Sequence, residues 1–251
     1  MMGDVSRGCA IVTGASRGLG SAIARRLGAD GWPVAVNYRS DAHGAHRVVA
    51  DIRARGGRAE AAAADVTDED SVAALAQEAQ ALLGPVEVLV INATGPQPVV
   101  GVADLTWQDH LDQLTFFVKS PTLLVQAALP AMKARGRGRV ISIGSDAFER
   151  STPGMSAYNA AKGAQIGLTR TWARELGEFG ITVNVVAPGW IPVERHAGAS
   201  PEALERYAAD VALRRMGEPD DIADVVAFVA SDASRFVTGE RITVNGGHTI
   251  D

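Results

Sequence analysis

Residues 9–20 read CAIVTGASRGLG, an apolar run followed by a turn with three glycines, and this stretch decides the fold. The apolar residues predict a short strand, Cys9–Thr13, and the residues after the turn predict a helix, Gly18–Ala29. Glycines permit a tight turn and let backbone N–H groups approach a phosphate, and the positive end of a helix favours an anion. Ordinary strand-to-helix turns also carry glycines, but the position in the first such unit favours a site for a dinucleotide pyrophosphate.

The rest of the chain repeats the alternation of strand and helix. Further strands are predicted at Val34–Tyr38, Arg58–Ala63, Val86–Asn92, Arg139–Ile143, Ile181–Val186 and Arg241–Val244. Further helices are predicted at Ala42–Arg55, from Thr67 or Asp68 to Leu83, at Trp107–Ala134 with a break near Pro121, at Met155–Phe179 and at Pro219–Ser231. Because such alternation is typical of a parallel sheet covered on both faces, we predict a single doubly wound, Rossmann-type α/β domain over residues 1–251, with a mostly parallel seven-stranded sheet.

Composition and charge narrow the class of protein. The 251 residues are 47% hydrophobic, and the net charge of −5 gives no reason to expect nucleic acid or a membrane as a partner. The single cysteine, Cys9, lies in an apolar run and is expected to be a buried, inert thiol. The lack of a cysteine pair, of an apolar stretch in residues 1–8 and of 18 consecutive apolar residues predicts a cytoplasmic protein without a transmembrane helix.

A tyrosine and a lysine one helical turn apart, Tyr158 and Lys162, form the candidate reactive pair. A free tyrosine has a pKa of about 10, and a neighbouring ammonium stabilises the phenolate and lowers that pKa. Ser145 lies just past the predicted strand that ends at Ile143, at the edge of the sheet where ligands of doubly wound folds bind. Ser145 could instead bond its own backbone in a turn, and Ser142, inside the strand, is the weaker candidate.

The glycine turn, the segment Ile141-Ser142-Ile143-Gly144-Ser145 and the Tyr158-x-x-x-Lys162 pair together resemble the short-chain dehydrogenase/reductase family over essentially the whole chain, close to its 3-oxoacyl-acyl-carrier-protein reductases. The resemblance implies NAD(P)-dependent hydride transfer between a nicotinamide and a small-molecule carbonyl or alcohol, such as a 3-oxoacyl thioester or another ketone. In that reaction Tyr158 is the general acid or base, Ser145 bonds the carbonyl oxygen, and Lys162 tunes Tyr158.

The cofactor is expected to be NADP(H), with NAD as the alternative. The residues after the second predicted strand, Tyr38-Arg39-Ser40, offer no acid for a ribose 2′-hydroxyl, and Arg17 with Arg39 would suit a 2′-phosphate unless both arginines are simply solvated. The resemblance implies cofactor contacts from Gly14, Ser16, Arg17, Gly18, Leu19, Gly20, Tyr38, Arg39, Ser40, Asp65, Val66, Asn92, Ala93, Tyr158, Lys162, Pro188, Gly189 and Ile191. Asp65 could instead cap the following helix.

Two residues depart from the family pattern. Phe117 stands where the family usually has an asparagine that holds a water relay to the lysine, so Thr115 or Gln113 would have to substitute, or the helix would have to start differently, or turnover would be slow. Val193 stands where the family has a threonine that bonds the nicotinamide. These departures support the alternative of a cofactor-binding scaffold or regulator with weak or lost turnover.

The remaining signals concern the lid, assembly and charge. Residues 188–216 are predicted to be irregular with one short helix, and about 190–216 would form a substrate lid. The resemblance implies a homotetramer or homodimer, with the helices of residues 107–134 and 155–179 packed between subunits. No metal site is expected, and the basic segment of residues 135–139 is expected to be a solvated turn.

Overall fold

The computed structural model describes residues 7–250, and its centre is one seven-stranded sheet in the order β3-β2-β1-β4-β5-β6-β7. Every adjacent pair of strands is parallel. The strand order reverses between β1 and β4, which makes their carboxyl ends the switch point where doubly wound folds bind ligands. The strands are β1 Cys9–Val12, β2 Val34–Tyr38, β3 Ala59–Ala63, β4 Val86–Ile91, β5 Gly138–Ile143, β6 Ile181–Pro188 and β7 Arg241–Val244. The predicted fold class is confirmed.

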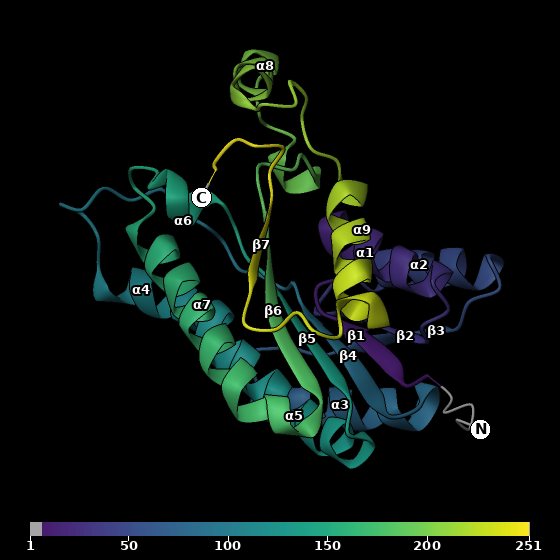
Figure 1. Ribbon diagram of the computed structural model, residues 1–251. Coiled ribbons are helices and arrows are strands. Elements are labelled where there is room, and N and C mark those ends of the chain that lie inside the picture. Colours follow the sequence, from purple (N-terminus) through teal and green to yellow (C-terminus); the bar gives the residue numbers. More distant parts are fainter. Residues whose placement is uncertain (1–6, 251) are drawn as a thin grey trace.

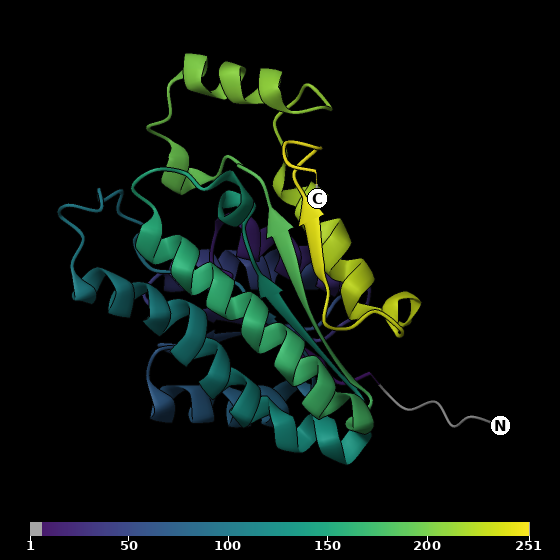
Figure 2. The ribbon, with the colours of Figure 1, turned by 60° about the vertical axis from the view of Figure 1, so that its left-hand side comes forward.

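Helices cover both faces of the sheet (Figures 1 and 2). Alternate residues of a strand point to opposite faces, so β1 sends Ala10 and Val12 into one core and Cys9 and Ile11 into the other. The first core is covered by α1 Gly18–Ala29, α2 Ala42–Ala54 and α9 Pro219–Ala230. The second is covered by α3 Glu69–Leu83, α5 Ser120–Arg135 and α7 Ser156–Leu176. Because both faces are buried, the strands are mostly apolar and do not alternate between apolar and polar residues.

The sequence predicts a break in the helix near Pro121. The irregularity lies earlier instead, at residues 115–119, and it is a π-helical turn. Helix α4, Trp107–Leu114, passes into a π-helical turn at Thr115–Lys119 before α5 begins. Pro121 lies just after this turn and has no N–H to donate to the helical carbonyl groups before it. The helix therefore widens at residues 115–119 and is not interrupted by the proline.

The continuous helical stretch of residues 107–135 is long and apolar enough to cross a membrane by length and composition alone. Its contacts are those of a core helix, because α5 buries Leu124, Val125, Ala128 and Met132 against the sheet. Of the most apolar window in this stretch, 33% is buried within the chain. The rest of this window is therefore not buried by other parts of the described chain.

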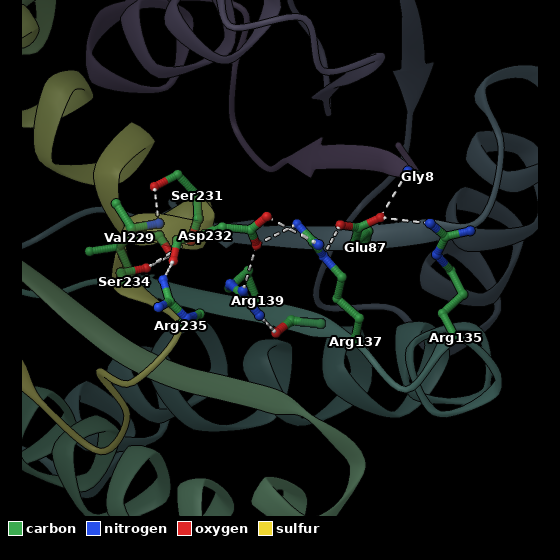
Figure 3. Close-up of polar contacts among 12 residues, drawn as sticks. Gly8, Glu87, Arg135, Arg137, Arg139, Val229, Ser231, Asp232, Ser234 and Arg235 are labelled. Carbon is green, nitrogen blue, oxygen red and sulfur yellow. Dashed lines mark hydrogen bonds and ion pairs between the residues drawn. The ribbon is translucent and has the colours of Figure 1, made fainter. Parts of the chain in front are cut away.

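The basic segment of residues 135–139 is a network of ion pairs, so the prediction of a solvated turn is wrong (Figure 3). Glu87 in β4 is 1% exposed and pairs with Arg135 at 3.1 Å and with Arg137 at 2.5 Å. Arg137 and Arg139 also pair with Asp232, at 2.8 and 3.4 Å. We call these five residues the amino-end cluster, because they lie where β4 and β5 begin.

Several boundaries differ from prediction. β6 continues to Pro188 because β7 pairs with its last residues, and the irregular segment contains η3 Glu194–His196 and α8 Pro201–Asp210. Helix α6, Ala147–Arg150, and the single turns η2 Gly177–Phe179 and η4 Asp232–Ser234 complete the described elements. The expectation of a cytoplasmic protein rests in part on the lack of an apolar stretch in residues 1–8. Residues 1–6 lie outside the described residues, as does residue 251 at the end of the predicted domain.

Candidate active site

The predicted site residues follow the carboxyl ends of β1, β2, β3, β4, β5 and β6. Hydrogen bonds hold neighbouring segments together at this edge of the sheet. The Asn92 side chain, after β4, donates to the carbonyl oxygens of Thr13 at 2.9 Å and Gly14 at 3.2 Å, after β1. The Asp146 N–H, after β5, donates to the Pro188 carbonyl at the end of β6, at 2.9 Å. These bonds join the loops in two pairs, the one after β4 to the one after β1 and the one after β5 to the end of β6.

The glycine turn has the shape expected of a cradle for phosphate. Gly18 has a φ of +54°, which a residue with a side chain rarely adopts. A Cβ at Gly20 would lie 2.4 Å from the Gly14 carbonyl oxygen, so only glycine lets the start of α1 pack this closely. Helix α1 has no side-chain cap of its own and no acid in its first turn, so the N–H groups of that turn suit an anion. These features fit the pyrophosphate of a dinucleotide.

Two polar residues that the sequence analysis missed keep this turn in place. The Asn37 side chain, 1% exposed, accepts from the Gly14 N–H at 3.2 Å. The Thr13 hydroxyl oxygen accepts from the N–H groups of Asn92 and Ala93, at 2.9 and 3.0 Å. The available signal was a polar side chain at the end of an otherwise apolar strand.

The region expected to meet the adenosine ribose lies after β2 and β3. Arg39 is two-thirds exposed and lies 3.8 Å from the Asp65 carboxylate. Asp65 accepts from the Thr67 hydroxyl and N–H, which together with Arg39 hold the pKa of its carboxyl below the usual value. The cap of α3 is Asp68, so the alternative that Asp65 caps this helix is wrong. Arg17, at the start of α1, is exposed, and Val66 is buried.

The candidate reactive residues lie on β5, its loop and α7. Tyr158 is 7% exposed and Lys162 is 4% exposed, and the Lys162 Nζ lies 5.6 Å from the centre of the Tyr158 ring. Lys162 donates to the Ile143 carbonyl at 2.7 Å and to Gln165 Oε1 at 3.3 Å. The Ser145 hydroxyl oxygen accepts from the Ala147 N–H at 3.1 Å, and its own hydrogen can still be donated to a substrate oxygen.

Phe117 lies directly against this pair. Its ring is 4% exposed, meets the Tyr158 ring edge-to-face at 5.4 Å, and has the Lys162 Nζ 3.8 Å from its centre. The polar residues expected to replace it bond elsewhere: Gln113 donates to the Pro96 carbonyl at 2.9 Å and Thr115 to the Leu111 carbonyl at 2.8 Å. The helix begins at Trp107, where it was predicted to begin, and Phe117 lies in the π-helical turn inside it.

Residues after β6 lie over the site. Helix α8 lies beyond the carboxyl ends of β6 and β7 (Figure 2). Its Tyr207 hydroxyl oxygen accepts from the Trp190 N–H at 2.8 Å, and their rings meet edge-to-face at 5.4 Å. A cavity of about 130 Å³ lies here, lined by both residues and by Val211 and Val244. Burial raises the pKa of Tyr207, so its hydroxyl stays neutral.

The sequence analysis also missed the charged residues that follow Ser145. Asp146 is completely buried and lies 3.0 Å from Arg150 Nε, 3.4 Å from the His248 ring nitrogen and 3.4 Å from the Asn245 amide. A guanidinium nitrogen of Arg241 lies 3.4 Å from the Ser145 carbonyl oxygen. The Ser145 loop is thus anchored to the last strand and the segment after it. The signal was the charged run Asp146-Ala147-Phe148-Glu149-Arg150 beside a site residue.

A second cavity, of about 190 Å³, lies between residues 96–98 and the start of the long helix. Its lining includes Gln113, Thr115 and Phe116, which are close in sequence to Phe117. Among residues 7–250, no group of three or more histidine, cysteine, aspartate or glutamate side chains is arranged to hold a metal ion.

Comparisons with known proteins agree with this geometry. Residues 14–249 match the family described as Enoyl-(Acyl carrier protein) reductase. The chain is 40% identical over 240 residues to 3-oxoacyl-(acyl-carrier-protein) reductase FabG of Staphylococcus aureus, covering 95% of this chain and 96% of that protein. It is 36% identical over 241 residues to the 3-oxoacyl-(acyl-carrier-protein) reductase of Synechocystis, covering 95% of each chain.

Solved structures give the same result. A mutant of a Serratia marcescens short-chain dehydrogenase/reductase superimposes with a TM-score of 0.90 at 33% identity, covering 98% of this chain and 99% of that one. A blue fluorescent protein from a metagenomic library, in complex with NADPH, superimposes with a TM-score of 0.89 at 39% identity, covering 98% of this chain and all of that one. Matches of this extent in sequence and in fold confirm the resemblance: the chain belongs to the short-chain dehydrogenase/reductase family, close to its 3-oxoacyl-acyl-carrier-protein reductases.

Proposed function

We propose that the chain is an NADP(H)-dependent oxidoreductase that interconverts a small-molecule ketone and its alcohol, with a 3-oxoacyl thioester as the favoured class of substrate. One observation carries the proposal: a buried phenol and a buried ammonium, Tyr158 and Lys162, lie on one face of α7, in the half of the fold where Ser145 and the glycine turn follow their strands. The relatives named as 3-oxoacyl-(acyl-carrier-protein) reductases support the substrate class, and the structure in complex with NADPH supports the cofactor.

The proposed roles follow from the chemistry of each side chain. When bound, the reduced nicotinamide supplies the hydride. Ser145 donates a hydrogen bond to the carbonyl oxygen, on which negative charge develops. Tyr158 donates its proton to the same oxygen, or removes it in the reverse direction, and the Lys162 ammonium stabilises the phenolate that results. The buried position of the pair strengthens this electrostatic effect, because water screens it little.

The glycine turn, with Gly14, Ser16, Gly18, Leu19 and Gly20, is proposed to hold the pyrophosphate. Arg17 and Arg39 are proposed to hold the 2′-phosphate of NADP. Both guanidinium groups are exposed and can reach a ligand, and Arg39 has only a 3.8 Å contact with Asp65 to give up. The other proposed cofactor contacts are Tyr38, Ser40, Asp65, Val66, Asn92, Ala93, Pro188, Gly189 and Ile191. Residues 190–216 are proposed to cover the substrate as a lid.

The assembly is proposed to be a homotetramer or homodimer built on α4, α5 and α7. Trp107 and Leu111 on α4 are 68% and 38% exposed, and Phe148 next to α7 is 43% exposed. Exposed apolar side chains such as these favour burial against a second copy. A cytoplasmic location is also proposed, because the one cysteine is free and buried and needs no oxidising compartment.

Tyr158→Phe tests the proposal. The variant keeps the ring and its packing but removes the proton donor, so kcat for ketone reduction should fall about 10²–10⁴-fold. Turnover is followed by the loss of NADPH absorbance across a panel of 3-oxoacyl thioesters and other ketones, and cofactor affinity by fluorescence titration. NADPH affinity should change little. Near-normal turnover by the variant would contradict the role of Tyr158, and a failure of the wild type to bind NADPH would contradict the function itself.

A further inference from the structure

Glu194 lies at the start of α1, where the proposed function places the cofactor's pyrophosphate. The Gly18 N–H donates to Glu194 Oε1 at 3.3 Å, across 176 positions of sequence. The other carboxylate oxygen lies 3.2 Å from the position that a Cβ on Gly18 would take, and the Val193 Cβ lies 3.5 Å from it. Both side chains come from the segment that follows β6, so this segment contacts the glycine turn directly.

Helix α1 depends on an acceptor from elsewhere in the chain. Helices α2, α3, α4 and α8 each begin with a side chain of their own that accepts from a first-turn N–H. In α1 the residue in that position is Arg17, which makes no such bond, and the first turn has no acid. A carboxylate here satisfies an N–H group and interacts favourably with the positive end of the helix. Glu194 therefore meets the chemical need that a phosphate would meet.

We propose that Glu194 occupies the pyrophosphate position in the free protein and that the dinucleotide must displace it, so that Glu194 sets the affinity for the cofactor. This inference rests on the proposed function. Two anions cannot share the same N–H groups, because each needs the donors and the two repel each other. When the dinucleotide binds, the hydrogen bond between the Gly18 N–H and Glu194 is lost, and this loss lowers the affinity for the cofactor.

The displacement also links the cofactor to the proposed lid. Glu194 begins the turn η3, and the adjacent backbone is tied to the rest of the segment because the Ile191 carbonyl lies 3.0 Å from the His196 ring nitrogen. The Glu194 side chain is exposed and long, so it can swing into solvent while these contacts hold. The release of Glu194 thereby frees the segment from the glycine turn at the moment when the cofactor arrives.

The experiment measures NADPH affinity without any substrate, by fluorescence titration of the purified full chain. Glu194→Gln removes the charge and Glu194→Ala removes the acceptor as well. Both variants should bind NADPH more tightly than the wild type, on the order of 3-fold to 10-fold. The Tm of the cofactor-free Glu194→Ala variant should fall, because α1 loses its acceptor, while for both variants the rise in Tm on adding NADPH should be larger than in the wild type.

Glu178→Gln is the matched control, because Glu178 is an exposed acid in η2, outside the proposed lid, and its loss changes the net charge equally. If Glu178→Gln tightens binding as much as Glu194→Gln, long-range charge explains the effect and the inference is overturned. Unchanged or weaker NADPH binding by both Glu194 variants, with a lower Tm, would assign Glu194 a structural role only and would overturn it too. A wild type that binds no NADPH would instead contradict the proposed function, so the two failures are distinguishable.

Discussion

At the scale of single residues, three contacts of the Lys162 ammonium bear on its charge. A backbone carbonyl oxygen, Ile143, and an amide oxygen, Gln165, accept its hydrogen bonds at 2.7 and 3.3 Å. The third neighbour is the face of Phe117, whose centre lies 3.8 Å from Nζ. An aromatic face attracts a cation by about 0.5–2 kcal/mol, and the attraction is largest where water is excluded. Phe117 therefore supports the charged form of Lys162, which in the proposed reaction stabilises the Tyr158 phenolate.

Phe117→Leu tests this contact, since leucine keeps the apolar character of the site and removes the aromatic face. With a less stabilised ammonium, the phenolate of Tyr158 is less favoured, and the rate of alcohol oxidation should need a higher pH. The rising limb of the pH–rate profile should move up by about half a unit to one unit. The profile of kcat against pH, measured in the oxidative direction, checks it.

Phe179→Leu is the control for this prediction, because Phe179 has the Lys133 Nζ 3.9 Å from its ring centre, away from the candidate site. That variant loses a cation–π contact of the same kind and should keep the wild-type profile. If the Phe117 variant also keeps the wild-type profile, the aromatic face has no influence on the reactive pair.

The residue scale also shows what sequence can predict. Cys9 was expected to be buried and inert, and it is fully buried in the core, where desolvation raises the pKa of its thiol to about 12. An apolar run in a parallel sheet has both faces covered, so burial follows from the sequence alone. The contact between Glu194 and Gly18 joins segments 176 positions apart. No local pattern carries such information, because the contact depends on how β6 and β1 lie in the sheet.

At the scale of elements, the helices and strands that the sequence predicts are those stabilised by local interactions or by a regular pattern of apolar residues. The seven strands were all predicted to within about two residues, because continuous apolar runs between glycine-rich turns are typical of buried parallel strands. Helix α6, Ala147–Arg150, was not predicted. Its polar residues are held by distant partners: Arg241 pairs with Glu149, and Asp146 lies beside His248. The π-helical turn has no known sequence signal either, and its place beside the reactive pair agrees with the frequent use of such turns at functional sites.

Helix α9 gives a prediction at this scale. Asp221 in its first turn accepts from the Glu218 N–H at 2.8 Å and from both terminal nitrogens of Arg215, at 2.6 and 2.7 Å. These bonds, chiefly those from Arg215, lower the pKa of the carboxyl from 3.8 to about 2. Because the folded-state pKa lies below the ordinary value, the carboxylate stabilises the folded state above about pH 4, and this contribution is lost as the pH falls toward 2.

Asp221→Asn should therefore lower the free energy of unfolding by about 1 kcal/mol near neutral pH, a value reduced for solvent screening because the pair is partly exposed. As the pH falls from about 5 to about 2, the difference from wild type should shrink, as measured by urea unfolding at several pH values. Asp220→Asn, which removes an exposed neighbour on the same turn, is the control. A stability difference that stays constant with pH would show that Asp221 acts as a neutral cap and not through its charge.

At the scale of the whole molecule, the two ends of the sheet do different work. The carboxyl end carries glycines, hydroxyl groups and the segment after β6, and few of these contribute to the core. The amino end carries the amino-end cluster around Glu87 (Figure 3). Through it β4, the residues before and within β5, and η4 after α9 are joined by ion pairs. Stability concentrated at one end leaves the other free to carry strained turns and exposed charges that a ligand needs.

If the amino-end cluster stabilises the fold, Glu87→Gln should destabilise it. The buried carboxylate also accepts from the Gly8 N–H at 2.9 Å, and its loss would leave two arginines facing a neutral amide. Removing one member of a buried ionic network costs about 3–5 kcal/mol, because the remaining charge stays desolvated. For a domain of this size, that loss should lower the Tm by about 10 °C.

Since the cluster lies at the edge of the sheet opposite the candidate site, the folded variant should keep the wild-type KM and kcat at low temperature. Thermal unfolding at fixed protein and NADPH concentrations and steady-state kinetics measure the two effects separately. Glu60→Gln provides the comparison, because Glu60 pairs with Arg53 while 41% exposed and should contribute less than about 1 kcal/mol. Equal Tm values for the Glu87 and Glu60 variants would refute a stabilising role for the cluster. A fall in kcat with an unchanged Tm would show that the amino end of the sheet also acts on the site.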